Sequence, residues 1–388
     1  MPAVPDLPPV PPVPPGFAAA YRAQRARFPG LSGRQPVHTV YVPADRFTAG
    51  TVAAWRDEAL GLVHAHLAGP GELADVFGVP DGTAAAVHAR LLAKLGREPI
   101  EDLRIDFEDG YGAPPDAVED AHVEQAAEAV AALHAAGALP RRWGPRVKSF
   151  ADGDPERSIR TLAGIVHGVA ERAGGLPPGF TVTFPKVLME DYLRQFADVL
   201  AQLEDGLGAR LRFEMQVEAP QTLPFLRAEL AEALDGRLAA AHFGVFDYTA
   251  ALGLPPHEQR LDHPACDHAR HVMQTAFAGT GVELSDGSLA ASPASGRAGD
   301  VHALWRRHAE LVRHSLRHGF YQGWDMHPSH LVSRFAAVYA FHLADYDAHR
   351  ERVRAWEERR EAGGGVMDEP ATIRTLAAAL RRADAALP

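Results

Sequence analysis

The chain has 388 residues, of which 46% are hydrophobic and 8% aromatic, a composition typical of a well-packed globular protein and not of a disordered one. Its formal net charge of -11 argues against non-specific binding to nucleic acid, although a local cluster of cations could still hold an anionic substrate. The single cysteine, Cys266, cannot form an internal disulfide, and we find neither an export signal nor an apolar run of membrane-spanning length. We therefore expect a cytoplasmic protein that does not enter a membrane.

Proline dominates the beginning of the chain, where residues 5–16 read PDLPPVPPVPPG. This composition predicts an extended polyproline segment, so we assign residues 1–30 to a tail or an arm that contacts another subunit. The first strand is expected at HTVYVP, residues 38–43. Two amphipathic segments follow it, at 53–68 and 83–95, and they predict a helical insertion before the second strand.

Short apolar runs and helical patterns then alternate along the chain. The runs that predict strands are LRIDFED, RVKSF, FTVTFPKV, LRFEMQVE, AAHFGVF, VELSD and GWDMHP, and the expected helices span 117–136, 158–173, 265–279 and 300–318. Such alternation predicts parallel strands joined by crossover helices, and the length suits a (β/α)8 TIM barrel. We assign residues 31–335 to this α/β barrel and residues 336–388 to a C-terminal helical extension, which is broken by glycines 363–365 and ends in a helix at 371–386.

Two acidic residues, Glu218 and Asp247, each end an apolar run. In FEMQVE the strand period places Phe213, Met215 and Val217 on one face and the polar side chains, including Glu218, on the other. The same period in HFGVFDY predicts that Asp247 ends a strand. Carboxylates at strand ends are how a barrel enzyme presents oxygen ligands to a hard cation, although either acid could simply cap the helix that follows.

Six short segments together resemble the HpcH/HpaI aldolase and citrate lyase beta-subunit family of the phosphoenolpyruvate/pyruvate barrel superfamily. They are DFEDGYG, RVKSF, FPKV, VEAPQT, FGVFDYTAALG and GWDMHPSH, and they follow the family's order between about residues 38 and 335. The insertion after the first strand and the Lys148–Ser149 pair depart from the family pattern. These departures indicate a divergent branch of the family.

The resemblance implies a divalent metal, Mg²⁺ or alternatively Mn²⁺, bound by Glu218 and Asp247, and two carboxylates with water and substrate oxygens also suit magnesium on chemical grounds. It makes Arg146 the residue that holds a carbonyl or enolate oxygen, because a guanidinium is always charged. A salt bridge at the rim is the alternative for Arg146. Glu108 and Asp109 resemble the family's acidic pair, which orients the arginine and the metal's water ligands, although a purely structural ion pair is the other reading.

Three further residues are assigned to substrate binding. Lys186 could form a Schiff base, but a lysine that binds a carboxylate is the better reading when a metal is available. His327 and Pro328 lie where the resemblance places the end of the eighth strand, and His327 could either touch the substrate or lock the rim of the barrel. A catalytic acid from the C-terminal segment is expected in citrate lyase-type relatives, often across a subunit boundary, and Asp345 or Asp347 is the nearest candidate.

A histidine-rich loop offers a competing metal hypothesis. Its candidate zinc ligands are His257, His263, Cys266, His268 and His271. Their spacing matches no standard zinc finger, so we do not expect a zinc site made of these residues.

These features predict a Mg²⁺-dependent carbon-carbon lyase that cleaves or forms a hydroxy acyl-CoA or a hydroxy-oxo acid through an enolate. The alternatives are a malate-synthase-like condensing enzyme or thioesterase, and a non-catalytic module that binds an oxo acid. The expected partners are a small oxo acid or an acyl-CoA thioester. From the resemblance and the long C-terminal helices we also expect a homo-oligomer, a trimer or a hexamer.

Overall fold

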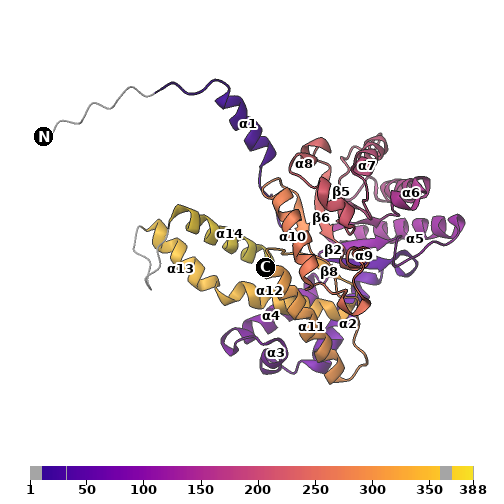
Figure 1. Cartoon of the computed structure of the whole chain (residues 1–388). Coiled ribbons are helices and arrows are strands. Elements are labelled where there is room, and N and C mark those ends of the chain that lie inside the picture. Colours follow the sequence, from indigo (N-terminus) through magenta and orange to yellow (C-terminus); the bar gives the residue numbers. More distant parts are fainter. Residues whose placement is uncertain (1–10, 32, 359–368, 388) are drawn as a thin grey trace.

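The computed structural model describes residues 11–31, 33–358 and 369–387. Eight parallel strands form one sheet in the order β7-β6-β5-β4-β3-β2-β1-β8. A parallel bridge between Ser285 and Gln322 joins the two edge strands, and the Asp286 N–H donates to the Gln322 carbonyl at 2.8 Å. The sheet is thereby nearly closed into the expected (β/α)8 barrel (Figure 1). The strands are β1 (His38–Pro43), β2 (Asp102–Asp106), β3 (Arg142–Arg146), β4 (Val182–Phe184), β5 (Phe213–Val217), β6 (Leu238–Phe243), β7 (Glu283–Ser285) and β8 (Gly323–Asp325).

Helices surround the barrel in the order that the sequence predicts. The helices that follow strands are α5 (Asp116–Ala135), α6 (Pro155–Ala173), α7 (Glu190–Leu203), α8 (Glu229–Ala233), α9 (Val245–Ala251), α10 (Pro264–Phe277), α11 (Ala298–Arg317) and α12 (Pro328–Ala344). The insertion after β1 contains α2 (Thr51–His66), α4 (Asp81–Arg97) and a helix that the pattern did not predict, α3 (Pro70–Phe77). These three helices pack against α11 and α12.

The core lies between the strands and the helices and forms two apolar clusters. Phe213, Met215 and Val217 of β5 point into the second cluster, as their alternation predicts. The opposite face of β5 points into the barrel, where Glu214 accepts two hydrogen bonds from Arg104, at 2.9 and 2.8 Å. The barrel interior therefore holds paired charges instead of an apolar filling.

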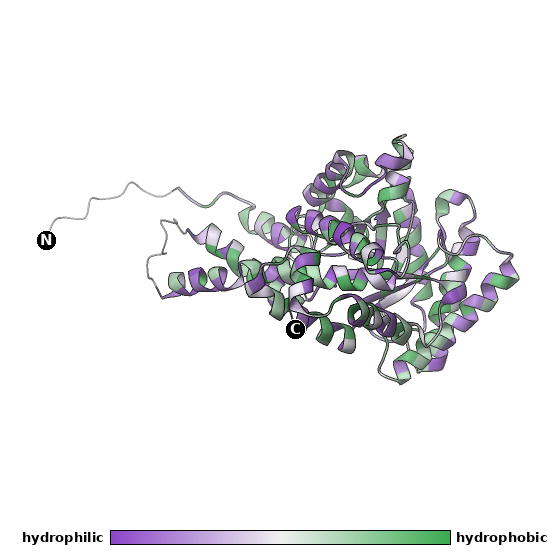
Figure 2. Cartoon of the chain, turned by 90° about the horizontal axis from the view of Figure 1, so that it is seen from below, coloured by the Kyte–Doolittle hydropathy of each residue, from purple (hydrophilic) through white to green (hydrophobic). Residues whose placement is uncertain are grey.

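Three helices project from one side of the barrel: α1 (Phe17–Arg27), α13 (Tyr346–Glu357) and α14 (Pro370–Ala386) (Figures 1 and 2). No side chain of α1 is buried. The helices α13 and α14 pack on each other, and Leu376, Ala383 and Ala386 are the buried residues of α14. The glycines at 363–365, where we expected a break, lie outside the described residues. Among the described helices, none is long and apolar enough to cross a membrane.

Two strand predictions were displaced. The third strand is Arg142–Arg146 and not the run RVKSF, of which only Arg146 belongs to the strand. Gly144 and Pro145 hid this strand, because both residue types are normally depleted from strand interiors. The sixth strand ends at Phe243, so the prediction that the same strand reaches Asp247 was wrong. Gly244 turns the chain, and Asp247 lies in the first turn of α9.

Candidate active site

Charged side chains from the ends of five consecutive strands, β2 to β6, meet at the carboxyl-terminal mouth of the barrel. Glu108 and Asp109 follow β2, Arg146 ends β3, and Lys186 follows β4. Glu218 is the first residue after β5, and Asp247 comes from the helix after β6. The mouth therefore gathers the two predicted metal ligands, the three predicted catalytic residues and Lys186. It does so because parallel strands place their carboxyl ends on one rim.

Arg146 is held by a residue that sequence reasoning did not select. Its Nε and Nη2 donate to the two carboxylate oxygens of Asp106, both at 2.6 Å, and its Nη1 lies 3.2 Å from Glu108. Its guanidinium also lies over the Tyr41 ring, 4.9 Å from the centroid. Arg146 and Asp106 are 4% and 1% exposed, so the guanidinium has one orientation and remains charged.

Asp106 also shapes the loop that carries the acidic pair. Its Oδ1 accepts the N–H of Glu108 at 3.0 Å, and its Oδ2 accepts the N–H of Gly110 at 2.9 Å. A Cβ on Gly110 would lie 2.5 Å from that Oδ2, so only glycine allows this close approach. In a strand, alternate residues share a face, so the segment DFED places Asp106 and Glu108 on the same side. This alternation could have identified Asp106 as a site residue from the sequence.

Lys186 lies at the centre of the acidic cluster. Its Nζ contacts Glu108 and also Asp109, the latter at 2.6 Å, and it lies 3.7 Å from Asp247. Burial alone would lower the pKa of Lys186, but Glu108 and Asp109 outweigh it and raise that pKa above the ordinary lysine value. The amine is therefore held as an ammonium ion, which is not a nucleophile.

The strained backbone of Lys186 directs its N–H toward Glu218. Lys186 has a positive φ of 47°, which non-glycine residues rarely adopt, and its N–H donates to Glu218 Oε1 at 2.7 Å. On the other side of the carboxylate, a Cβ at Gly244 would lie 2.5 Å from Glu218 Oε2. The Glu218 carboxylate is thus set in a backbone cradle that only a glycine at position 244 permits.

The surroundings of Glu218 favour the binding of a cation. The side chain is 4% exposed, and within the described residues no Lys, Arg or His nitrogen lies within salt-bridge distance of it. Burial, together with Glu108 and Asp247, raises the pKa of Glu218 to about 8, against the opposing effect of Arg146 and Lys186. A buried carboxylate in this state is stabilised by an added cation.

The donor set fits magnesium better than zinc. All the nearby acidic groups offer oxygen, and Asp247 is 45% exposed, so water and substrate have access to it. In the part of the chain that the structure describes, no three potential ligands converge within 4.8 Å at this mouth. Glu218 and Asp247 are the carboxylates that would hold a Mg²⁺ ion, and water or substrate oxygens would be its remaining ligands.

His327 and Pro328 lie at the rim, after β8, where they begin α12. His327 caps this helix by accepting the Ser329 N–H, at 3.2 Å, and its Nε2 lies 3.7 Å from Glu58. Pro328 is buried in the first turn of α12. With these contacts His327 fixes the start of α12 at the rim of the barrel. Its contact with the substrate stays a prediction.

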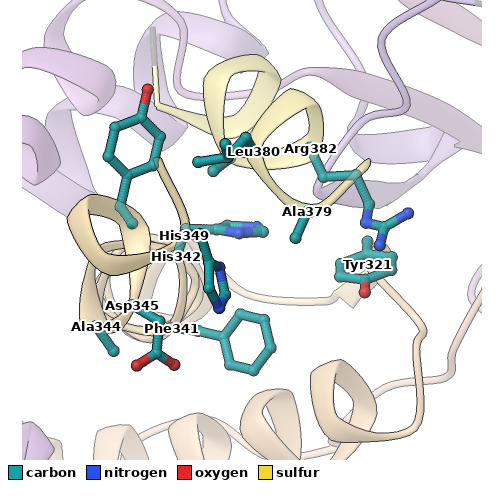
Figure 3. Close-up of a pocket in the computed structure, with 11 residues that line it drawn as sticks. Tyr321, Phe341, His342, Ala344, Asp345, His349, Ala379, Leu380 and Arg382 are labelled. Carbon is teal, nitrogen blue, oxygen red and sulfur yellow. The ribbon is translucent and has the colours of Figure 1, made fainter. Parts of the chain in front are cut away.

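Asp345 and Asp347 lie at the far end of the protein. Helix α12 runs from the mouth to the opposite end of the barrel, a length of about 25 Å for its 17 residues. Asp345 lines a pocket of about 210 Å³ there, between the C-terminal helices and Tyr321 (Figure 3). Asp347 is exposed and pairs with Arg350 at 2.9 Å. Neither carboxylate reaches the mouth of its own barrel, so a catalytic role for them requires a second subunit.

The absence of a zinc site from the histidine-rich loop stays a prediction. His257, His263, Cys266, His268 and His271 take no part in the clusters of potential metal ligands found among the described residues. Cys266 is buried, and burial raises the pKa of its thiol to about 12. The thiol packs within the second apolar cluster.

Comparisons with known proteins identify a family and a fold. A family model described as a domain of unknown function (DUF6986) matches residues 17–386. No curated protein matches the chain. Among solved structures, a citrate lyase from Burkholderia xenovorans LB400 is similar, with 17% identity, a TM-score of 0.61 and coverage of 91% of this chain and 93% of that one.

Two other solved structures share the fold at comparable coverage. CitE from Mycobacterium tuberculosis, in complex with magnesium, acetoacetate and coenzyme A, has 19% identity and a TM-score of 0.51, and covers 91% of this chain and 99% of that one. Malate synthase from Haloferax volcanii, at 3 mM glyoxylate, has 14% identity, a TM-score of 0.51 and the same two coverages. At these identities the likeness establishes a common barrel fold.

Proposed function

Because the chain belongs to the family described as a domain of unknown function (DUF6986), whose description assigns no activity, we propose a function from the geometry of the mouth: Mg²⁺-dependent formation or cleavage of a carbon-carbon bond beside a carbonyl group. The observation that carries the proposal is that two groups lie on the same rim: the buried carboxylate of Glu218, and the guanidinium of Arg146, which Asp106 holds in one orientation. The similar folds of citrate lyase, CitE and malate synthase support this reaction class.

The chemistry of the mouth and these likenesses support the substrate class that we propose. CitE was solved with magnesium and coenzyme A, and malate synthase with glyoxylate. For this chain we propose a hydroxy acyl-CoA or a hydroxy-oxo acid. When bound, Mg²⁺ would supply a Lewis acid that polarises the carbonyl group of the substrate.

Arg146 has the role of an oxyanion partner. During carbon-carbon cleavage, negative charge grows on the oxygen of the carbonyl group, and a charged guanidinium with a single orientation stabilises that charge without rearranging. Asp106 positions the guanidinium through both carboxylate oxygens, so it acts through Arg146 and not on the substrate. Lys186 balances the charge of Glu108 and Asp109, and its ammonium state disfavours the Schiff-base alternative.

The decisive experiment is deuterium exchange from solvent into the methyl groups of pyruvate and of acetyl-CoA, followed by NMR. We expect exchange that requires Mg²⁺, stops on addition of a chelator, and falls at least about a hundredfold in Glu218→Gln, since loss of a preorganised electrostatic contact typically costs this much. The matched control is Glu310→Gln, which removes an exposed carboxylate outside the mouth.

The outcomes separate the competing mechanisms. Exchange that survives the chelator but stops in Lys186→Met would overturn the metal mechanism in favour of a Schiff base. Magnesium binding by calorimetry without exchange in either donor would support the non-catalytic oxo-acid-binding module instead.

A malate-synthase-like condensation is the second candidate, and the similarity to the Haloferax volcanii enzyme favours testing it. Incubation with acetyl-CoA and glyoxylate would then release free CoA, which a thiol reagent measures. The protein's single cysteine is buried and its pKa is raised to about 12, so it contributes little background. A lyase that retains the thioester would release no free CoA in this assay.

A further inference from the structure

Two histidines and an aspartate converge on the outside of the barrel, away from the mouth. His314 lies in the last turn of α11, His318 caps the same helix, and Asp267 lies in the first turn of α10. Both histidine Nε2 atoms point at Asp267 Oδ1, at 2.8 and 3.5 Å. This is one of two groups of three potential metal ligands among the described residues, and all three members are partly exposed.

The hydrogen bonds of His318 determine where its lone pair points. Its Nδ1 lies 3.0 Å from the carbonyl oxygen of His314, and a carbonyl can only accept, so Nδ1 carries the proton. In neutral His318, Nε2 is therefore a bare acceptor that faces the carboxylate oxygen of Asp267. Two acceptors that face each other repel, unless a proton or a cation lies between them. A ring N–H that donates to a backbone carbonyl is also the usual arrangement of a metal-binding histidine.

The surrounding backbone holds His318 in place. Gly319 has a φ of 78°, and the Phe320 N–H donates to the Ser315 carbonyl at 3.0 Å, which closes α11 with a Schellman motif. The Gln274 side chain donates to the carbonyl of His318. The ring at the end of α11 is thus preorganised, and little conformational entropy remains to be lost on binding an ion.

Asp267 is not needed to neutralise its cationic neighbour. Arg270 contacts Asp267 Oδ1 at 2.6 Å, but its Nε also donates to the buried carboxylate of Asp286 at 2.9 Å, and its Nη2 donates to the Leu261 carbonyl. Asp286 therefore matches the charge of Arg270. The hydrogen bonds that the described residues make with the Asp267 carboxylate go to Oδ1, which leaves the lone pairs of Oδ2 for a further ligand.

The second group of potential ligands, His308, Asp325 and His330, shows what a purely structural cluster looks like. Asp325 accepts both guanidinium donors of Arg334, at 2.8 and 3.1 Å, and also contacts His38. His330 donates to the Ala291 carbonyl with Nε2 and accepts the Met326 N–H with Nδ1. Its polar atoms are satisfied and it is buried, so no cation is required there.

We propose that Asp267, His314 and His318 form a second metal site, which binds a borderline transition-metal dication of the Zn²⁺ class and is separate from the oxygen-only mouth. Two imidazoles at i and i+4 of one helix and one carboxylate are ligands for Zn²⁺, Co²⁺ or Ni²⁺ and not for Mg²⁺. Water completes the coordination. The bound ion would clamp the start of α10 to the end of α11 and so stabilise the outer layer of the barrel.

The test is a titration of the full chain with Co²⁺, in excess Mg²⁺ and in the Glu218→Gln background, so that the mouth does not contribute. We expect one equivalent of Co²⁺ to produce a visible d–d absorption band, and Zn²⁺ to displace it and raise the Tm. His314→Ala and His318→Gln should each weaken Zn²⁺ binding at least about tenfold in competition with a chromophoric chelator, as expected for loss of one of few ligands.

The matched control is His268→Ala, which removes an exposed histidine from the same helix as Asp267 and should leave the affinity unchanged. Circular dichroism of each variant without metal checks that the fold is retained. Absence of a d–d band, or Zn²⁺ binding that is equal in the wild type and both histidine variants, would overturn the proposal and leave the cluster as a proton-linked polar contact.

Discussion

At the scale of single residues, the mouth depends on Asp106 as much as on the residues that the sequence singled out. Its two oxygens accept two donors of Arg146 and two backbone N–H groups of the following loop. One buried carboxylate therefore sets both the direction of the guanidinium and the position of Glu108. The sequence singled out Glu108 and Asp109 but not Asp106, whose role became visible only in the contacts.

We predict that Asp106→Asn slows the proposed exchange reaction about a hundredfold while Mg²⁺ binding changes less than about threefold. The amide replaces one acceptor by a donor that faces the guanidinium, so Arg146 loses its orientation while Glu218 and Asp247 are untouched. Exchange rates by NMR and Mg²⁺ affinity by calorimetry measure the two effects. Equal losses in both, or a normal exchange rate, would contradict the positioning role.

At the scale of elements, β3 forms through a close approach of two backbones, although its sequence lacks the alternating side-chain pattern of a typical strand. A Cβ at Gly144 would lie 2.0 Å from the carbonyl oxygen of Thr181, at the end of the loop that leads into β4. The Thr181 N–H donates to the Trp143 carbonyl at 2.9 Å. Glycine is required here for space, which is why the strand carries so little of the usual strand signal.

We expect Gly144→Ala to lower the free energy of unfolding by about 3 kcal/mol, because an added methyl group overlaps rigid backbone and separates β3 from β4. Chemical denaturation followed by circular dichroism measures the change. Gly61→Ala is the matched control, since a Cβ at Gly61 meets no heavy atom within 4 Å and a helix favours alanine. A loss at position 144 no larger than at position 61 would refute the proposed close approach.

At the scale of the whole molecule, the partly buried His342 links stability to pH. Burial lowers the pKa of His342 to about 4, and its ring lies near Tyr321 beneath the barrel. Below pH 6.5 the His342 ring binds a proton in the unfolded chain but stays neutral in the folded chain until the pH approaches 4. The contribution of His342 to the free energy of unfolding therefore falls as pH drops from 6.5 to about 4.

We predict that His342→Phe removes this dependence. Compared with the wild type, the variant should lose less stability between pH 6.5 and 4, by up to about 1.4 kcal/mol per pH unit, which is the effect of one proton. Denaturation curves at several pH values give the difference, and the other titrating groups cancel in it. Parallel curves for the two proteins would show that His342 is not held neutral.

The α1 arm, Phe17–Arg27, presents a surface that suits contact with another protein chain. It buries no side chain, and the rings of Phe17 and Tyr21 stack 6.2 Å apart while remaining 58% and 53% exposed. Paired exposed aromatic rings are typical of surfaces that contact another protein. A second copy of the chain would also be the source of any acid that approaches the mouth from α12 or α13.

We expect the full chain to form a trimer or hexamer in multi-angle light scattering, and Phe17→Ala combined with Tyr21→Ala to lower the mass. Leu252→Ala, which removes an exposed apolar side chain elsewhere, should leave the mass unchanged. A monomeric mass for the wild type would contradict the predicted oligomer.

The sequence by itself determined the α/β class, the order of the strands and the acids that follow β2 and β5, because strand and helix periods are local and are written in neighbouring residues. It missed α3, displaced β3 and extended β6 into α9, since glycine and proline obscure those periods. Only the tertiary structure decided how Asp106 pairs with Arg146, why Lys186 is strained against Glu218, and that His314 meets Asp267. These contacts join residues far apart in the chain, and they arise only when the barrel closes and brings distant strand ends and helices together.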